Sequence, residues 1–186
     1  MKKTILGYIF LACCIFAVSM WCNGISEELR DNVVRLHIIA NSDSPFDQDV
    51  KLKIRDRLLE VSKKNGHTPT LKEMEQEAND VLDSHNAQYK ATAHFGRYTF
   101  DRRDYEGFIL PKGDYTAVRI ELGQAQGRNW WCVLSPPVCF TKSSVKLKEE
   151  LGENLSNETV NTVVSEGITV KLKLMELMYD VRNRLK

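Results

Sequence analysis

The stretch that decides the fold is "VVRLHIIANSDSPFDQDVKLKI", from Val33 to Ile54, because its periodicity changes halfway along. Its first part, residues 33–40, is short, β-branched and apolar, which is typical of a buried strand. Ser44, Pro45 and Asp47 then supply an N-cap, a proline at the first helical position and an acid in the first turn. A helix is expected to begin here, with an apolar stripe at helical spacing that consists of Phe46, Val50, Ile54, Leu58 and Val61.

The chain after this helix continues to switch between helical and strand periods. A capping box at residues 70–73 opens a second amphipathic helix. Residues 90–100 and 114–122 alternate between apolar and polar, and residues 130–134 indicate a further strand. Because a glycine-containing connector joins the last two, residues 114–134 are predicted to form a strand pair with a loose loop.

The C-terminal part turns polar after residue 140, with a short helix expected at residues 145–151. A final helix shows an apolar stripe and a basic outer face; the stripe is Val170, Leu174, Leu177, Met178, Val181 and Leu185. We therefore predict an α+β (or small α/β) fold, a single layered domain of a three- to four-stranded sheet with amphipathic helices packed on it. Residues 25–140 would be the core and 141–186 an extension whose helix packs on it.

Residues 1–24 form a separate segment, "MKKTILGYIFLACCIFAVSMWCNG", in which two lysines precede an uncharged apolar stretch from Thr4 to Cys22. This pattern sends the following chain across a membrane. The apolar stretch reaches the roughly 20 residues that span a bilayer, while Ala17 and Ser19 offer a cleavage site. The segment is thus a signal peptide or a signal-anchor helix, and the domain is expected outside the cytoplasm, secreted or held at the membrane.

The composition limits the classes of partner. The 186 residues are 42% apolar and carry a formal net charge of +1, with both signs spread along the chain. This apolar fraction is enough for a globular core, and no basic face is large enough to hold a nucleic-acid backbone. We expect no nucleic acid as partner.

The cysteines divide between the export segment and the domain. Three lie in or beside the apolar stretch, which leaves only Cys132 and Cys139 in the exported part. An isolated pair in an oxidising space favours a disulfide. A zinc site would need two more ligands, and neither Cys nor His stands at ligand spacing near this pair.

Few residues suggest catalysis. A thiol enzyme that pairs Cys132 with His37 or His94 stays open, although the histidines are scattered along the chain. Gly123 and Gly127 do not indicate a phosphate loop, because such a loop opens a helix and this one opens a strand. We predict no catalytic residue and no cofactor.

Three acids, Asp43, Asp47 and Asp49, superficially suggest a calcium loop, but the glycine and terminal glutamate of an EF-hand are missing. Acids at a helix N-terminus complement the helix dipole, which explains them better. A site that combines a histidine with Asp43 or Asp47 stays open, and the prediction is that no metal is bound.

Two neighbouring tryptophans, Trp130 and Trp131, point to opposite faces of their strand. Helices can cover both faces of a sheet, in which case both side chains are core. If one is exposed instead, it is a good anchor for a binding partner.

Taken together, the exported N-terminus and the stretches "VVRLHIIANSDSPFDQDVKLKIRD" and "FILPKGDYTAVRIELGQAQGRNWWCVLSPPVCF" resemble the stage II sporulation protein R family of endospore-forming Firmicutes. The resemblance implies a signalling protein made in the forespore and exported into the space between the two membranes. There it would activate a membrane-embedded aspartic protease of the mother cell, which removes the pro-sequence of sigma E. The family brings no catalytic residues with it, so we expect no enzyme.

On this resemblance, we expect the domain to contact the extracytoplasmic face of the protease. The candidate contact residues are Gly123, Gly127, Arg128, Asn129, Trp130 and Trp131. The rival interpretations are an extracytoplasmic cell-wall enzyme or thiol hydrolase that uses Cys132, and a wall-binding module.

Overall fold

A computed structural model describes residues 2–65, 69–105, 107–136, 138, 144–164 and 170–185. The chain divides into two compact units. We call Val33–Tyr98 with Tyr115–Phe140 the sheet unit, and Met1–Asn32, Thr99–Asp114 and Thr141–Lys186 the helical unit. The domain boundaries predicted at residues 24 and 140 stay a prediction.

The sheet unit is built on a four-stranded sheet with the order β2-β5-β1-β6. Strand β1 runs parallel to β5 and antiparallel to β6, so the sheet is mixed and the predicted α+β class is confirmed. The prediction that residues 114–134 form a strand pair was wrong, because β1 lies between those two strands. The strands are β1 (Val34–Ile39), β2 (Ala91–Phe100), β5 (Gly113–Leu122) and β6 (Asn129–Ser135), and β2 and β5 extend by a few residues into the helical unit.

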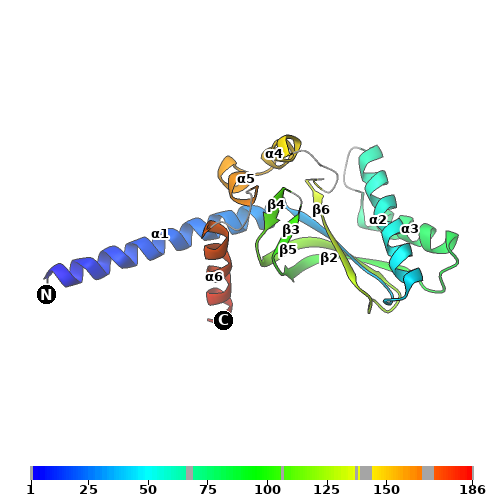
Figure 1. Ribbon diagram of the computed structural model, residues 1–186, viewed down its shortest axis with the longest axis horizontal. Coiled ribbons are helices and arrows are strands. Elements are labelled where there is room, and N and C mark those ends of the chain that lie inside the picture. Colours follow the sequence, from blue (N-terminus) through cyan, green and yellow to red (C-terminus); the bar gives the residue numbers. More distant parts are fainter. Residues whose placement is uncertain are drawn as a thin grey trace. The chain divides into compact units, whose positions relative to one another are not determined.

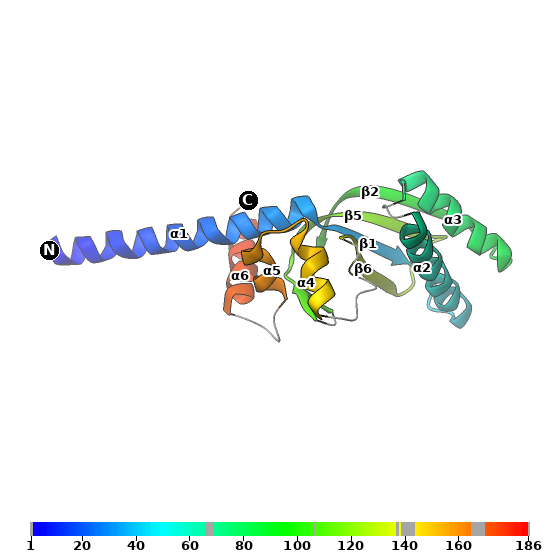
Figure 2. The ribbon, with the colours of Figure 1, turned by 90° about the horizontal axis from the view of Figure 1, so that it is seen from above.

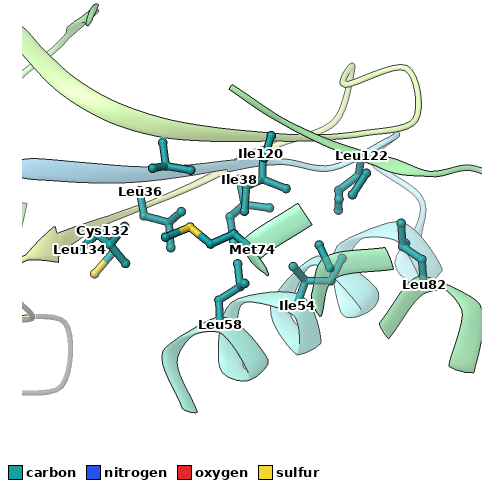
Figure 3. Close-up of a cluster of buried hydrophobic side chains, with 14 of the residues drawn as sticks. Leu36, Ile38, Ile54, Leu58, Met74, Leu82, Ile120, Leu122, Cys132 and Leu134 are labelled. Carbon is teal, nitrogen blue, oxygen red and sulfur yellow. The ribbon is translucent and has the colours of Figure 1, made fainter. Parts of the chain in front are cut away.

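Two helices, α2 (Pro45–Asn65) and α3 (Leu71–Ser84), cover one face of this sheet (Figure 1). Figure 3 shows the apolar layer between these helices and the sheet. Every second residue of the strands points into this layer, as the pleat of a strand requires. The core consists of Leu36, Ile38, Val50, Ile54, Leu58, Met74, Ala78, Leu82, Ala91, Ala93, Val118, Ile120, Leu122, Cys132 and Leu134.

Both helices begin where the sequence predicts. The Ser44 hydroxyl accepts from the backbone N–H of Asp47 at 3.1 Å, which caps α2. At α3 the Thr70 hydroxyl accepts from the N–H of Glu73, and the Glu73 carboxylate accepts from the N–H of Thr70, which is a complete capping box. Phe46 departs from the expected buried stripe of α2, because its side chain is 46% exposed.

The helical unit contains α1 (Lys2–Asn32), α4 (Ser144–Gly152), α5 (Asn157–Val163) and α6 (Val170–Arg184). It also holds a two-stranded antiparallel sheet of β3 (Arg103–Tyr105) and β4 (Phe108–Leu110), which the sequence did not indicate. The buried residues of α6 are Leu172, Met175 and Tyr179, so this helix does not bury the stripe that its sequence shows.

Helix α1 has two parts with different surroundings. Its N-terminal half is exposed and projects away from the other elements of the unit (Figure 2). Cys22, Ile25 and Leu29 of the C-terminal half are buried, where α1 contacts α5 and α6. The Glu28 carboxylate accepts from the N–H and the hydroxyl of Ser156, the N-cap of α5. The helix thus continues past residue 24, where the sequence analysis ended the export segment.

Candidate functional site

The turn between β1 and α2, residues 40–47, is organised around one carboxylate. Asp47 is buried, and its oxygens accept hydrogen bonds from the Asn41 amide at 2.9 Å and from the hydroxyls of Ser42 and Tyr89, each at 2.5 Å. Burial alone would raise the pKa of Asp47, but these hydrogen bonds outweigh it and keep the pKa below that of an ordinary carboxyl. Asp47 is therefore an ionised structural centre of the turn.

The Tyr89 hydroxyl is the partner of Asp47 in one of these hydrogen bonds, and its pKa is also shifted. Burial and the neighbouring Asp47 carboxylate both raise the pKa of this phenol, since each disfavours a second negative charge. The hydroxyl stays protonated and donates to the carboxylate. This contact joins the start of β2 to the first turn of α2 within the sheet unit.

The connector between β5 and β6, residues 123–128, lies directly on this turn. The N–H of Gly127 donates to the Ala40 carbonyl at 2.9 Å, and the N–H of Gln124 donates to the Asn41 side-chain oxygen at 2.9 Å. Asn41 therefore bonds the connector through its oxygen and Asp47 through its nitrogen. We call residues 40–47 and 123–128 together the loop pair. The connector is fixed by these bonds, in contrast to the loose loop that the sequence predicted.

Two glycines make this close contact possible. Gly123 has a φ of +55°, and a Cβ there would stand 2.3 Å from the Asn41 side-chain oxygen. A Cβ on Gly127 would stand 2.2 Å from the Ser42 carbonyl oxygen. Since real Cβ atoms do not approach other atoms this closely, both positions need glycine. This close approach is the physical reason for the two glycines in the connector.

A buried lysine and an exposed ion pair also hold the two loops of the loop pair together. Lys51 is buried and donates to the Gln48 side chain at 2.7 Å and to the Arg128 carbonyl at 2.9 Å. Burial lowers the pKa of Lys51, and the positive charge of Arg128 lowers it further. Asp43 accepts from the N–H of Arg128 at 2.7 Å and faces its guanidinium at 3.5 Å.

The surface of the loop pair combines charge with an exposed aromatic ring. The side chains of Asp43 and Arg128 are both largely exposed, and Phe46 stands exposed at the first turn of α2. Gln124 and Asn129 are also exposed. A fixed backbone that presents an aromatic residue and a charged pair is a suitable surface for a protein partner.

The two tryptophans predicted to contact a partner lie inside the sheet unit, on opposite faces. Trp130 packs against the core beneath α2, with the Arg55 guanidinium 5.4 Å from its ring centre. Trp131 is half-buried on the other face, where it stacks on the His37 ring at a centroid distance of 3.6 Å. Neither ring is a fully exposed anchor.

The face of the sheet that carries His37 is polar and aromatic. Arg119 lies 2.8 Å from Glu121 and 5.6 Å from the Tyr98 ring centre. His94 is 4.0 Å from the Glu121 carboxylate. Side chains alternate between the two faces along each strand. Both candidate histidines, His37 and His94, therefore lie on one face, the face opposite the apolar core.

The alternative thiol site is not assembled in this arrangement. Cys132 is buried in the core beside Leu36 and Leu134 (Figure 3), whereas His37 and His94 project from the opposite face of the sheet. A thiolate and its base must be within hydrogen-bond reach, and here the sheet separates them. Cys139 lies outside the described residues, so its disulfide with Cys132 stays a prediction.

The open metal hypothesis finds no support where it was placed. Among the described residues, no group of three or more His, Cys, Asp and Glu side chains could hold a metal ion. Asp43 and Asp47 are instead used by hydrogen bonds within the loop pair.

The export segment forms a helix of the expected kind. Within the described part of the chain, α1 is the helix that is long and apolar enough to cross a membrane. This agrees with a signal peptide or a membrane anchor.

Sequence reasoning missed four contributors to the loop pair, which are Asn41, Ser42, Lys51 and Tyr89. They come from three separate stretches, and a polar side chain gives no local signal of a partner that is distant in sequence. One clue was present, since the carboxyl ends of two parallel strands meet at one edge of a sheet. Recognising β1 and β5 as parallel neighbours would have brought the two loops together.

Comparison with known proteins gives one consistent answer. The stage II sporulation protein R family matches residues 30–145. The stage II sporulation protein R of Bacillus subtilis (strain 168) is 31% identical over 158 residues, which is 77% of this chain and 70% of the relative. No solved structure matches the chain at a significant level.

Proposed function

This chain is a member of the stage II sporulation protein R family, and we propose that it is a signal exported from the forespore into the intermembrane space. There it activates the membrane-embedded aspartic protease that removes the pro-sequence of sigma E. Family membership carries this proposal. The apolar α1 supports it, because an exported signal needs such a segment. The protein acts by binding and not by catalysis.

Activation requires that the signal prefer one state of its receptor. A ligand with equal affinity for both states would shift neither, however tightly it bound. A rigid surface serves this purpose better than a mobile one, because less conformational entropy is lost on binding. The loop pair is such a surface, since its backbone is tied by Gly127, Gln124 and Arg128 to the turn after β1.

We assign receptor contact to the exposed surface of the loop pair. Phe46 and Arg128 are the expected anchors, since aromatic and arginine side chains dominate binding energies at protein interfaces. Gly123 and Gly127 shape this surface, and Asn129 borders it at the start of β6. In this proposal Trp130 and Trp131 stabilise β6, the strand that follows the loop pair, and lie outside the centre of the receptor contact.

The test is cleavage of pro-sigma-E in cells that produce this chain together with the protease. Phe46→Ala and Arg128→Ala should each reduce cleavage severalfold, and the double variant should reduce it further. Phe95→Ala is the matched control, because Phe95 is another aromatic residue of the sheet unit and is 63% exposed on β2. Circular dichroism verifies folding. Full cleavage with the double variant would exclude the loop pair as the contact surface.

The thiol-enzyme alternative makes a separate prediction. Mass spectrometry of the exported protein, before and after reduction, reports its mature N-terminus and the state of Cys132. A protein that gains mass on reduction and takes up no alkylating reagent at Cys132 or Cys139 beforehand has a disulfide. A Cys132 thiol that alkylates readily, together with loss of signalling in a folded His37→Ala variant, would favour the enzyme.

A further inference from the structure

Helix α6 carries apolar residues on two faces. The inner face is buried in the helical unit through Leu172, Met175 and Tyr179. The outer face is a second stripe, with exposed fractions of 83% at Val170, 58% at Leu177, 43% at Val181 and 82% at Leu185. Exposing so many large apolar side chains together on one helix marks a surface that binds something apolar.

Basic residues border the outer face on both sides. At about 100° per residue, Lys173 and Arg184 fall on one side of the stripe and Lys171 and Arg182 on the other. The acidic residues lie away from its centre, and Asp180 is engaged by Lys112 at 2.8 Å. An apolar stripe flanked by cations is the pattern of a helix that lies in the surface of an anionic bilayer.

The position of α6 within the helical unit fits the same environment. The helix runs across α1 and is the element of the unit nearest to the projecting apolar half of α1 (Figures 1 and 2). Lys171 stands 5.4 Å from the ring centre of Trp21, and the Trp21 indole donates to Glu158. Trp21 lies at the end of the apolar stretch of α1, and tryptophan is enriched at that level of a membrane span.

From these observations we propose that the outer face of α6 lies in the headgroup layer of the membrane that α1 crosses, in contact with anionic lipid. Helix α1 would then cross the bilayer while α6 lies along its outer surface. The contact of α6 with the apolar α1 and the flanking cations favour lipid over a second copy of the chain. This inference needs α1 to be retained but does not depend on the protease.

The experiment uses the full chain in vesicles of phosphatidylethanolamine and phosphatidylglycerol. An environment-sensitive fluorophore is attached to a cysteine that replaces Leu177, in a background with alanine at Cys13, Cys14 and Cys22. The matched label replaces Asn183, which is exposed but lies away from the stripe. The same chain without a new cysteine measures background labelling.

We expect lipids with a doxyl group to quench the label at residue 177 severalfold more than the label at residue 183, with a blue-shifted emission at 177. Equal quenching of both labels by aqueous iodide would overturn the proposal, because α6 would then lie in water. A label at 177 that is shielded from iodide and from doxyl lipid would overturn it as well, since protein would cover the stripe.

Two further variants sharpen the result. Val181→Glu adds a charge at the centre of the stripe and should reduce the doxyl quenching at residue 177. Exchanging phosphatidylglycerol for phosphatidylcholine should reduce it too, because the flanking cations lose their anionic lipid. Quenching that stays unchanged in both experiments would contradict an interfacial helix.

Discussion

Helices α2 and α6 are both amphipathic, but only α2 buries the central residues of the stripe that its sequence shows. In α2 the stripe residues Val50, Ile54 and Leu58 face the sheet and are buried. In α6 four residues of the stripe are exposed, Leu174 and Met178 are half-buried, and a different face is buried. Helical periodicity thus reveals that two faces differ, but it does not reveal what covers each face. That depends on which other elements lie alongside.

The largest effect should come from the buried stripe of α2. Ile54→Ala leaves a cavity under the sheet and should reduce the free energy of unfolding by about 2–4 kcal/mol. Leu52→Ala on the same helix is the control, because Leu52 is exposed and its truncation should have little effect. Urea unfolding of the full chain in detergent, followed by hydrogen exchange in sheet-unit peptides, measures both. Equal losses would show that the assigned faces of α2 are wrong.

The first turn of α2 should show a pH-dependent effect. Asp47→Asn replaces a carboxylate that accepts several hydrogen bonds, and should cost about 2 kcal/mol at neutral pH. Because the pKa of Asp47 is lowered in the folded protein, its contribution is complete above the unfolded pKa near about 4 and is lost as the pH falls through the folded value.

Unfolding measured between neutral pH and strongly acidic pH tests this sign. The difference between the parent protein and Asp47→Asn should shrink steadily on the acid side. Asp49→Asn, which changes an exposed carboxylate on the same helix, provides the comparison. A difference that grows toward acid would contradict the assignment of Asp47 as an ionised centre.

The inner face of α6 should give a smaller effect. Tyr179→Phe removes the hydroxyl that donates to Asp114 at 2.7 Å and leaves the ring in place. The expected cost is about 1 kcal/mol, detectable as faster hydrogen exchange in peptides of the helical unit. Exchange that is unchanged there would mean that the hydroxyl adds no stability to this face.

The smallest effect should come from the outer face of α6. Leu177→Ala should change the unfolding free energy in detergent by less than about 0.5 kcal/mol, because the side chain packs against no protein core. A loss as large as that of Ile54→Ala would erase the contrast between the two helices.

The sequence predicted the elements better than their arrangement. The strand at β1, the capped starts of α2 and α3 and the apolar α1 were all identified, because each depends on residues close together in the chain. The short β3 and β4 were missed, since three residues are too few to show a period.

The pairing of β5 with β6 was predicted wrongly for a physical reason. Strands that follow each other in sequence usually pair, and nothing local in either strand indicates a third strand between them. The connector from Gly123 to Arg128 is long enough to pass over the end of β1, and its glycines let it do so closely. The candidate contact residues of the connector are held in place by its contact with the turn after β1, and this contact joins segments that are distant in sequence.

The central place of β1 has a consequence for how the protein is made. Val34 pairs with Thr116 on one side and Ser135 on the other, so the first strand to be synthesised waits for its partners until most of the chain has been translated. Pairing between such distant segments is slow. The chain therefore leaves the ribosome with an unfinished sheet, which β6 can complete only after Ser135 has been synthesised.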